Sequence, residues 1–168
     1  MKRFIIILTA VIATLSVSTQ EIKAQSQDLN ARVDSLSAKI EKLQHDFDLL
    51  QCQYDLQDIN NKLSSLADNA SMYSNSTLIN TYHGGFYSPL YDAYRANYDS
   101  LVGAFESFKE NAKITKFSVK LRMLSSNLTE QEKALLEQMM NTTNSAINKV
   151  EASLKSLKLA LDMYKSLE

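Results

Sequence analysis

The stretch of residues 82–91, YHGGFYSPLY, predicts the main reversal of the chain. It holds two of the three glycines of the sequence and its only proline. Glycine supplies the backbone freedom that a reversal needs, and Ser88-Pro89 is typical of a helix start, with serine as the N-cap and proline at the first helical position. The stretch therefore predicts a turn over residues 76–88 and a second helix over residues 89–126.

The sequence before this turn predicts one long helix, residues 26–75. Residues 25–83 contain neither glycine nor proline, and their apolar side chains recur at alternating steps of four and three. Two such stripes lie on the helix, with an offset of two residues near position 51. The first stripe is Leu29, Val33, Leu36, Ile40, Leu43, Phe47 and Leu50, and the second is Leu49, Cys52, Leu56, Ile59, Leu63, Leu66, Ala70 and Tyr73.

The sequence after the turn predicts two further helices. The second helix again carries two stripes with an offset of two residues, near position 113. They are Tyr91, Tyr94, Tyr98, Leu101, Phe105, Phe108 and Ala112, followed by Ile114, Phe117, Leu121, Leu124 and Leu128. Thr129 begins a capping box that opens a third helix, residues 130–167. Its single stripe is Leu136, Met140, Thr143, Ile147, Val150, Leu154, Leu157, Leu161 and Tyr164.

Three long helices with short connections predict an all-α fold, an elongated antiparallel three-helix bundle with coiled-coil-like packing. A reversal near Tyr82 places residue i of the first helix opposite roughly residue 164 − i of the second. The two stripe offsets then fall at one level. The same register places Asp46, Asp48, Asp55 and Asp58 opposite Lys109, Lys113, Lys116 and Lys120. We therefore expect these charges to select the register.

This register leaves the start of the first helix without a partner. Residues 25–37 extend beyond the bundle by about 18 Å at 1.5 Å per residue. Their apolar side chains, Leu29, Val33 and Leu36, form a candidate self-association surface. We expect weak homo-oligomerisation there, because a short isolated helix is marginal in water.

The N-terminus resembles a signal peptide, residues 1–24. Lys2 and Arg3 precede an apolar run, and Ile22-Lys23-Ala24 is a typical cleavage site before Gln25. We expect a periplasmic or secreted protein whose mature chain, residues 25–168, is one helical domain without a transmembrane segment. Cleavage removes three basic residues and one acidic residue, which leaves 15 basic and 18 acidic residues and a formal charge of −3. Such a charge gives no basic footprint for nucleic acid.

The residues that carry chemistry are scattered. Cys52 is the only cysteine, and His45 and His83 are far apart in the sequence. Cys52 lies in an apolar stripe, so we expect it in the core rather than as a reactive thiol. No Gly-rich phosphate loop, GxSxG elbow or HExxH pair occurs. We therefore expect that this protein is not an enzyme and that it has no catalytic residue, no cofactor and no metal site.

The aromatic residues of the reversal allow two interpretations. Tyr91, Tyr94 and Tyr98 lie on one helical stripe and are expected to cap the core. Around the glycines, a short turn has difficulty burying every ring, and exposed aromatic side chains beside glycine are typical of recognition surfaces. The candidate partner-binding residues are Tyr82, His83, Phe86 and Tyr87. The stretch is thus either a turn with a core cap or a binding surface.

The leading functional hypothesis is a non-catalytic, exported binding or scaffolding protein that acts through protein–protein contacts of its helices. Its partner is a protein whose identity the sequence does not give. A periplasmic holdase-type chaperone is the alternative, although the mild negative charge of this chain differs from the basic surface of known helical holdases. A membrane-active helical toxin is a further alternative, weakened because the mature chain has no long apolar run.

Overall fold

The computed structural model describes the backbone of residues 2–125 and 128–168, and the side chains of residues 25–124 and 128–168. It contains three helices: α1, Lys2–His83; α2, Ser88–Ser125; and α3, Glu130–Lys165. No strand occurs in the described part of the chain. The all-α three-helix bundle predicted from the sequence is confirmed. The side chains of the predicted signal peptide, residues 1–24, lie outside those described.

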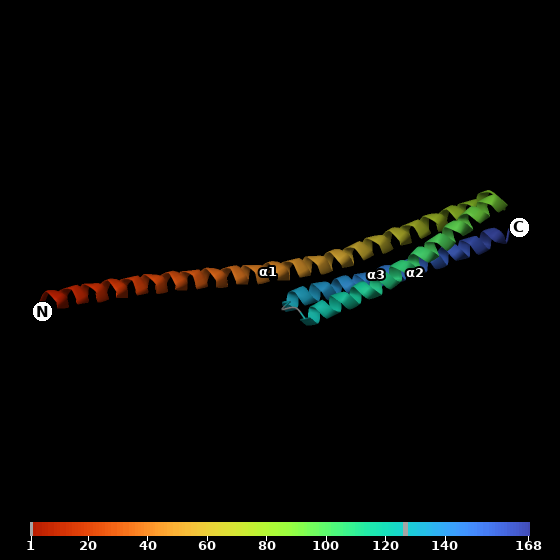
Figure 1. The fold of residues 1–168 in the computed structure, drawn as a ribbon. Helices are drawn as coiled ribbons and strands as arrows, with labels where there is room; N and C mark the ends of the chain where they lie inside the picture. Colours follow the sequence, from red (N-terminus) through yellow and green to blue (C-terminus); the bar gives the residue numbers. More distant parts are fainter. Residues whose placement is uncertain (1, 126–127) are drawn as a thin grey trace. The chain divides into compact units, whose positions relative to one another are not determined.

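The chain divides into two units, Met1–Asp46 and Phe47–Glu168. In the first unit, every described side chain from Gln25 to Gln44 is exposed. The second unit holds the bundle, in which α2 and α3 run side by side in opposite directions (Figure 1). The helices therefore pack on one another within residues 47–168.

Cross-helix contacts define the topology of the bundle. Ser71 and Ser74 on α1 lie beside Ser153 and Ser156 on α3, with 3.1 Å between the hydroxyl oxygens of each pair. The residue number increases in the same direction along both helices, so α1 and α3 are parallel. Lys109 Nζ on α2 donates to Glu151 Oε1 at 2.7 Å, and Lys116 Nζ donates to Asn144 Oδ1 at 2.6 Å. In these two pairs the residue number rises on α2 while it falls on α3, so α2 and α3 are antiparallel.

The core follows the second expected stripe of α1 and the single expected stripe of α3. Its fully buried leucines include Leu63 on α1 and Leu157 on α3, which belong to one cluster with Leu101 and Phe105 of α2. Cys52 is buried, as predicted, in a second cluster with Leu56, Val119, Leu128, Leu136 and Met140. The predicted stripe of α3 is buried except for Ile147, which is half-buried. The predicted capping box is also present, because Thr129 Oγ1 accepts from the Glu132 backbone N–H, and Glu132 Oε2 accepts from that of Thr129.

The end of the first helix was predicted wrongly, because α1 continues to His83 instead of ending near residue 75. Polar residues such as Thr77, Asn80 and Thr81 favour turns, but here their side chains donate to backbone carbonyls four residues earlier in the same helix. Thr77 is fully buried in this arrangement. The reversal is consequently confined to residues 84–87 rather than spread over residues 76–88.

The predicted register between the first two helices is also wrong. Asn80 Nδ2 donates to Tyr94 Oη at 2.8 Å, and an Arg122 guanidinium nitrogen lies 3.8 Å from Asp48 Oδ1. Facing residue numbers therefore add to 170–174 rather than 164. The reversal lies later in the sequence than expected. Each residue by which the reversal moves along the sequence raises the sum of two facing residue numbers by two.

The expected charge pairing fails for the same reason. Lys109 pairs with Glu151 on α3, and Lys113 pairs with Glu110 one turn earlier on α2. Among the acidic residues of α1, Asp58 pairs with Lys62 in its own helix. Asp48 does pair with α2, but with Arg122 instead of one of the four expected lysines.

Candidate functional site

The aromatic reversal contains both packed and exposed rings. Gly85 has φ of 66°, a left-handed conformation that glycine adopts without strain at a helix C-terminus. The Phe86 ring packs against Tyr164 and Tyr91, with centroid distances of 5.6 and 6.0 Å. Tyr82 is 73 % exposed and Tyr87 is 61 % exposed. His83 is exposed as well.

Tyr164 ties the C-terminal helix to this reversal. Its ring is fully buried, and its hydroxyl accepts a hydrogen bond from the Tyr87 backbone N–H at 3.1 Å. Tyr91, Tyr94 and Tyr98 pack against the core cluster, which agrees with their expected capping position. The structure therefore separates Phe86, which packs inward, from Tyr82 and Tyr87, whose rings face solvent.

This separation predicts different results for substitutions at the reversal. The single change Phe86→Ser is expected to lower the free energy of unfolding by about 1–3 kcal/mol, because it removes a ring packed on two tyrosines. The double change Tyr82→Ser with Tyr87→Ser is expected to stay within about 0.5 kcal/mol of the wild type. Thermal unfolding followed by circular dichroism measures both. Equal losses for the two variants would contradict this assignment of the rings.

The candidate self-association residues Leu29, Val33 and Leu36 are all exposed, each by more than half. The bare surface is longer than the predicted overhang of residues 25–37, because Ile40 and Leu43 are equally exposed. In the second unit, Phe47, Leu50 and Tyr54 of α1 are exposed too. The first predicted stripe of this helix is therefore bare over its whole described length.

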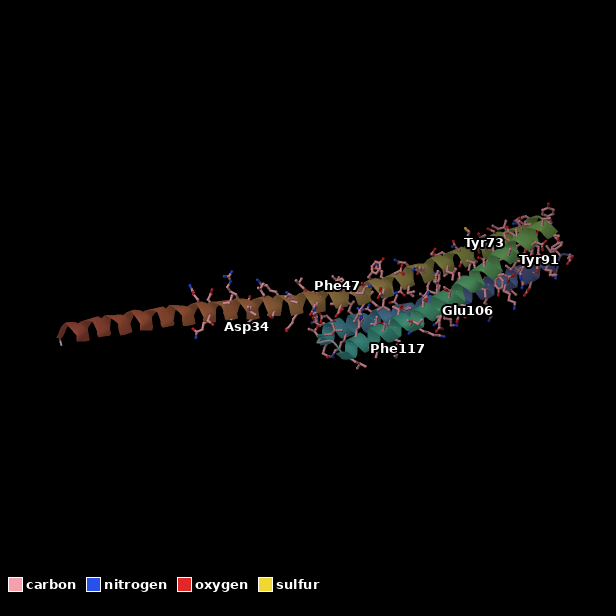
Figure 2. All side chains as sticks on the ribbon, in the orientation of Figure 1. Asp34, Phe47, Tyr73, Tyr91, Glu106 and Phe117 are labelled. Carbon is pink, nitrogen blue, oxygen red and sulfur yellow. The ribbon has the colours of Figure 1, made fainter. Side chains whose placement is uncertain are left out.

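A bare apolar stripe on α2 was not expected. Of the second stripe predicted for this helix, Leu128 is buried beyond the end of α2, but the other four side chains are exposed: Ile114, Phe117, Leu121 and Leu124. Val119, two residues from both Phe117 and Leu121, is buried instead. Two residues correspond to about 200° around an α-helix, so the bare stripe and the core lie on opposite sides of α2. Phe117 and Phe47 lie in the part of the bundle away from Tyr73 and Tyr91 (Figure 2).

A groove of about 680 Å³ lies between α2 and α3 beside this stripe. Phe117, Leu124 and Met123 of α2 and Met140 of α3 provide its apolar lining, and Lys113, Lys116 and Lys120 add positive charge. Glu137, Asn141 and Asn144 complete the lining on α3. The groove was not predicted from the sequence, because the stripe from Ile114 to Leu128 was expected to lie in the core. The three lysines of the groove, spaced three and four residues apart, are the signal in the sequence that could have indicated it.

The groove concentrates positive charge. Partial burial lowers the pKa of the Lys116 ammonium, and the neighbouring Lys120 and Lys113 lower it further. Lys116 is held in place by its hydrogen bond to Asn144 Oδ1. An acidic group placed near these three lysines would relieve their mutual repulsion. Lys113 already pairs with Glu110, so Lys116 and Lys120 are the groups that favour a negatively charged ligand.

Other chemistry is sparse in the described part of the chain. Burial raises the pKa of the Cys52 thiol, although Arg122 opposes this shift. Among residues 25–124 and 128–168, no group of three or more His, Cys, Asp or Glu side chains could hold a metal ion. No described helix is both long enough and apolar enough to cross a membrane.

Comparison of the chain with protein families, with curated proteins and with solved structures finds no match. The fold and the exposed surfaces define its class as an all-α three-helix bundle with bare apolar helix faces.

Proposed function

We propose that this chain is a non-catalytic, exported binding or scaffolding protein that acts through protein–protein contacts of its helices. The observation that carries the proposal is the apolar stripe of α2, which lies opposite the core and beside the groove between α2 and α3. Contiguous exposed apolar side chains of this size are typical of interaction surfaces. Export rests on the sequence of residues 1–24.

The groove favours an acidic amphipathic helix of a partner protein. Phe117 and Leu124 offer large apolar side chains, 64 % and 85 % exposed, which a partner's apolar face would cover. Lys113, Lys116 and Lys120 would meet acidic residues on the flank of that helix. Tyr82 and Tyr87 at the reversal offer a second contact surface, and Leu29, Val33 and Leu36 a surface for self-association.

Capture from an envelope extract of the native host tests this function. The mature chain, residues 25–168, is immobilised and the bound material is identified by mass spectrometry and lipid analysis. One protein bound in stoichiometric amount is the expected result. A broad set of unfolded proteins would indicate a holdase-type chaperone instead, and recovery of lipid without protein would indicate a membrane-active chain. Either outcome overturns the proposal.

A further inference from the structure

Helix α1 carries apolar side chains on two opposite sides where it enters the bundle. Leu50 is 62 % exposed, whereas Cys52, two residues later, is 2 % exposed. Tyr54 and Leu56 show the same contrast, with 68 % and 0 %. Because two residues turn an α-helix by about 200°, one apolar side faces α2 and α3 and the other is bare.

The bare stripe follows a heptad repeat that begins in the first unit. With Val33 and Ile40 at position a, the repeat places leucine at every d position: Leu29, Leu36, Leu43 and, further along the sequence, Leu50. The flanking a positions hold Ser26 and Phe47. β-branched residues at a combined with leucine at d favour parallel two-stranded coiled coils. Leucine at d recurs over the three heptads of residues 26–46, and two of these heptads also carry an apolar a residue, a pattern typical of a short coiled coil.

The residues that flank the seam permit pairing with an identical chain. Positions e are uncharged throughout: Asn30, Ser37, Gln44 and Gln51. Positions g carry Arg32, Lys39 and Asp46. In a parallel pair each g residue faces an e residue of the second copy, so each charge meets a polar, neutral side chain and no like charges oppose each other. A second copy of this chain is therefore electrostatically compatible along the whole seam.

An antiparallel arrangement fits the core positions less well. Centred between Ile40 and Leu43, it would bring Lys39 near Asp46 of the second copy, which is favourable. It would also place each a residue against a d residue, so the β-branched and leucine layers would be mixed. β-branched a layers alternating with leucine d layers are the arrangement of parallel two-stranded coiled coils, and we infer the parallel orientation from this pattern, against the single Lys39–Asp46 contact.

We propose that residues 26–46 form a parallel, in-register, two-stranded coiled coil with the same residues of a second copy of this chain. The inference deepens the proposed protein-binding function, on which it rests, by naming one partner and its orientation. Pairing would cover five large apolar side chains of the first unit, all bare in the single chain. It would also supply the packing that an exposed helical segment otherwise lacks.

The oligomeric state of the mature chain tests the inference. Sedimentation equilibrium of residues 25–168 is expected to give the mass of two chains. The change Leu36→Ser with Leu43→Ser is expected to weaken self-association by about a hundredfold or more, because two leucine layers are lost. The matched control, Ala31→Ser with Ala38→Ser, alters the outer f positions of the same heptads and is expected to remain dimeric. A monomeric or trimeric wild type overturns the inference, as does equal dissociation of both variants.

Disulfide formation tests the orientation in the same protein. In a Cys52→Ala background, Leu29→Cys is expected to link two copies upon oxidation, because parallel pairing brings residue 29 next to its own counterpart. Asp34→Cys, on the outer face, is expected not to link. Failure of Leu29→Cys in a dimer overturns the parallel orientation. Capture of the envelope partner is measured on each sample, so a monomeric wild type that still binds its partner refutes the dimer alone.

Discussion

Replacement of Leu157 by alanine is expected to lower the free energy of unfolding by about 2–5 kcal/mol. Leu157 is fully buried on α3 and belongs to the cluster that joins all three helices. Truncation removes three carbon atoms from a site where neighbouring leucines cannot easily collapse into the space. Denaturation by urea, followed by circular dichroism, measures the loss as a lower midpoint with an unchanged slope.

Leu159 provides the matched control for this prediction. It has the same side chain, lies two residues away on the same helix and is 61 % exposed. The change Leu159→Ala is expected to alter the free energy of unfolding by no more than about 0.5 kcal/mol. If Leu159→Ala costs as much as Leu157→Ala, the assignment of the buried face of α3 is wrong.

The second large effect is expected at the groove between α2 and α3. The change Phe117→Ser with Leu124→Ser is expected to abolish capture of the envelope partner, since large apolar side chains at the centre of an interface carry most of the binding energy. Both side chains are exposed, so the melting temperature should stay close to that of the wild type. Capture assays measure partner binding, and thermal unfolding measures the melting temperature, both on the same preparation.

Two further variants define the chemistry of the groove. Reversal of charge at Lys113, Lys116 and Lys120 to glutamate is expected to weaken capture and to invert its dependence on salt, because the acidic partner is then repelled and added salt screens that repulsion. The control change Leu159→Ser removes an exposed leucine outside the groove and is expected to leave capture intact. Retained binding by the Phe117/Leu124 variant would refute the groove as the binding surface.

The sequence was sufficient for the fold class and for the third helix. The stripe from Leu136 to Tyr164 is a single uninterrupted repeat, and Thr129 with Glu132 gives a specific signal for the helix start. One stripe on a helix leaves one choice of buried face. The burial of Thr143 within that stripe follows the repeat despite its hydroxyl, which donates to the Met139 carbonyl in the same helix.

The register and the bare faces could not be predicted from periodicity. A reversal displaced by a few residues moves every facing pair by twice that number, so the late end of α1 at His83 changed all expected contacts with α2. Helices α1 and α2 each carry two apolar stripes, and the repeat alone does not show which of them packs inward. Val119 and Cys52 are buried, whereas Phe117 and Leu50 are bare. The apolar stripes that do not pack inward form the candidate binding surfaces.

Site-specific photo-crosslinking in the native host tests whether a bare helix face of this bundle binds a protein partner. A benzophenone amino acid replaces Phe117, and in a second strain it replaces Leu159 as the exposed control. We expect one crosslinked protein at position 117 and none at position 159. Absence of any crosslink at position 117, or the same products at both positions, would contradict this expectation.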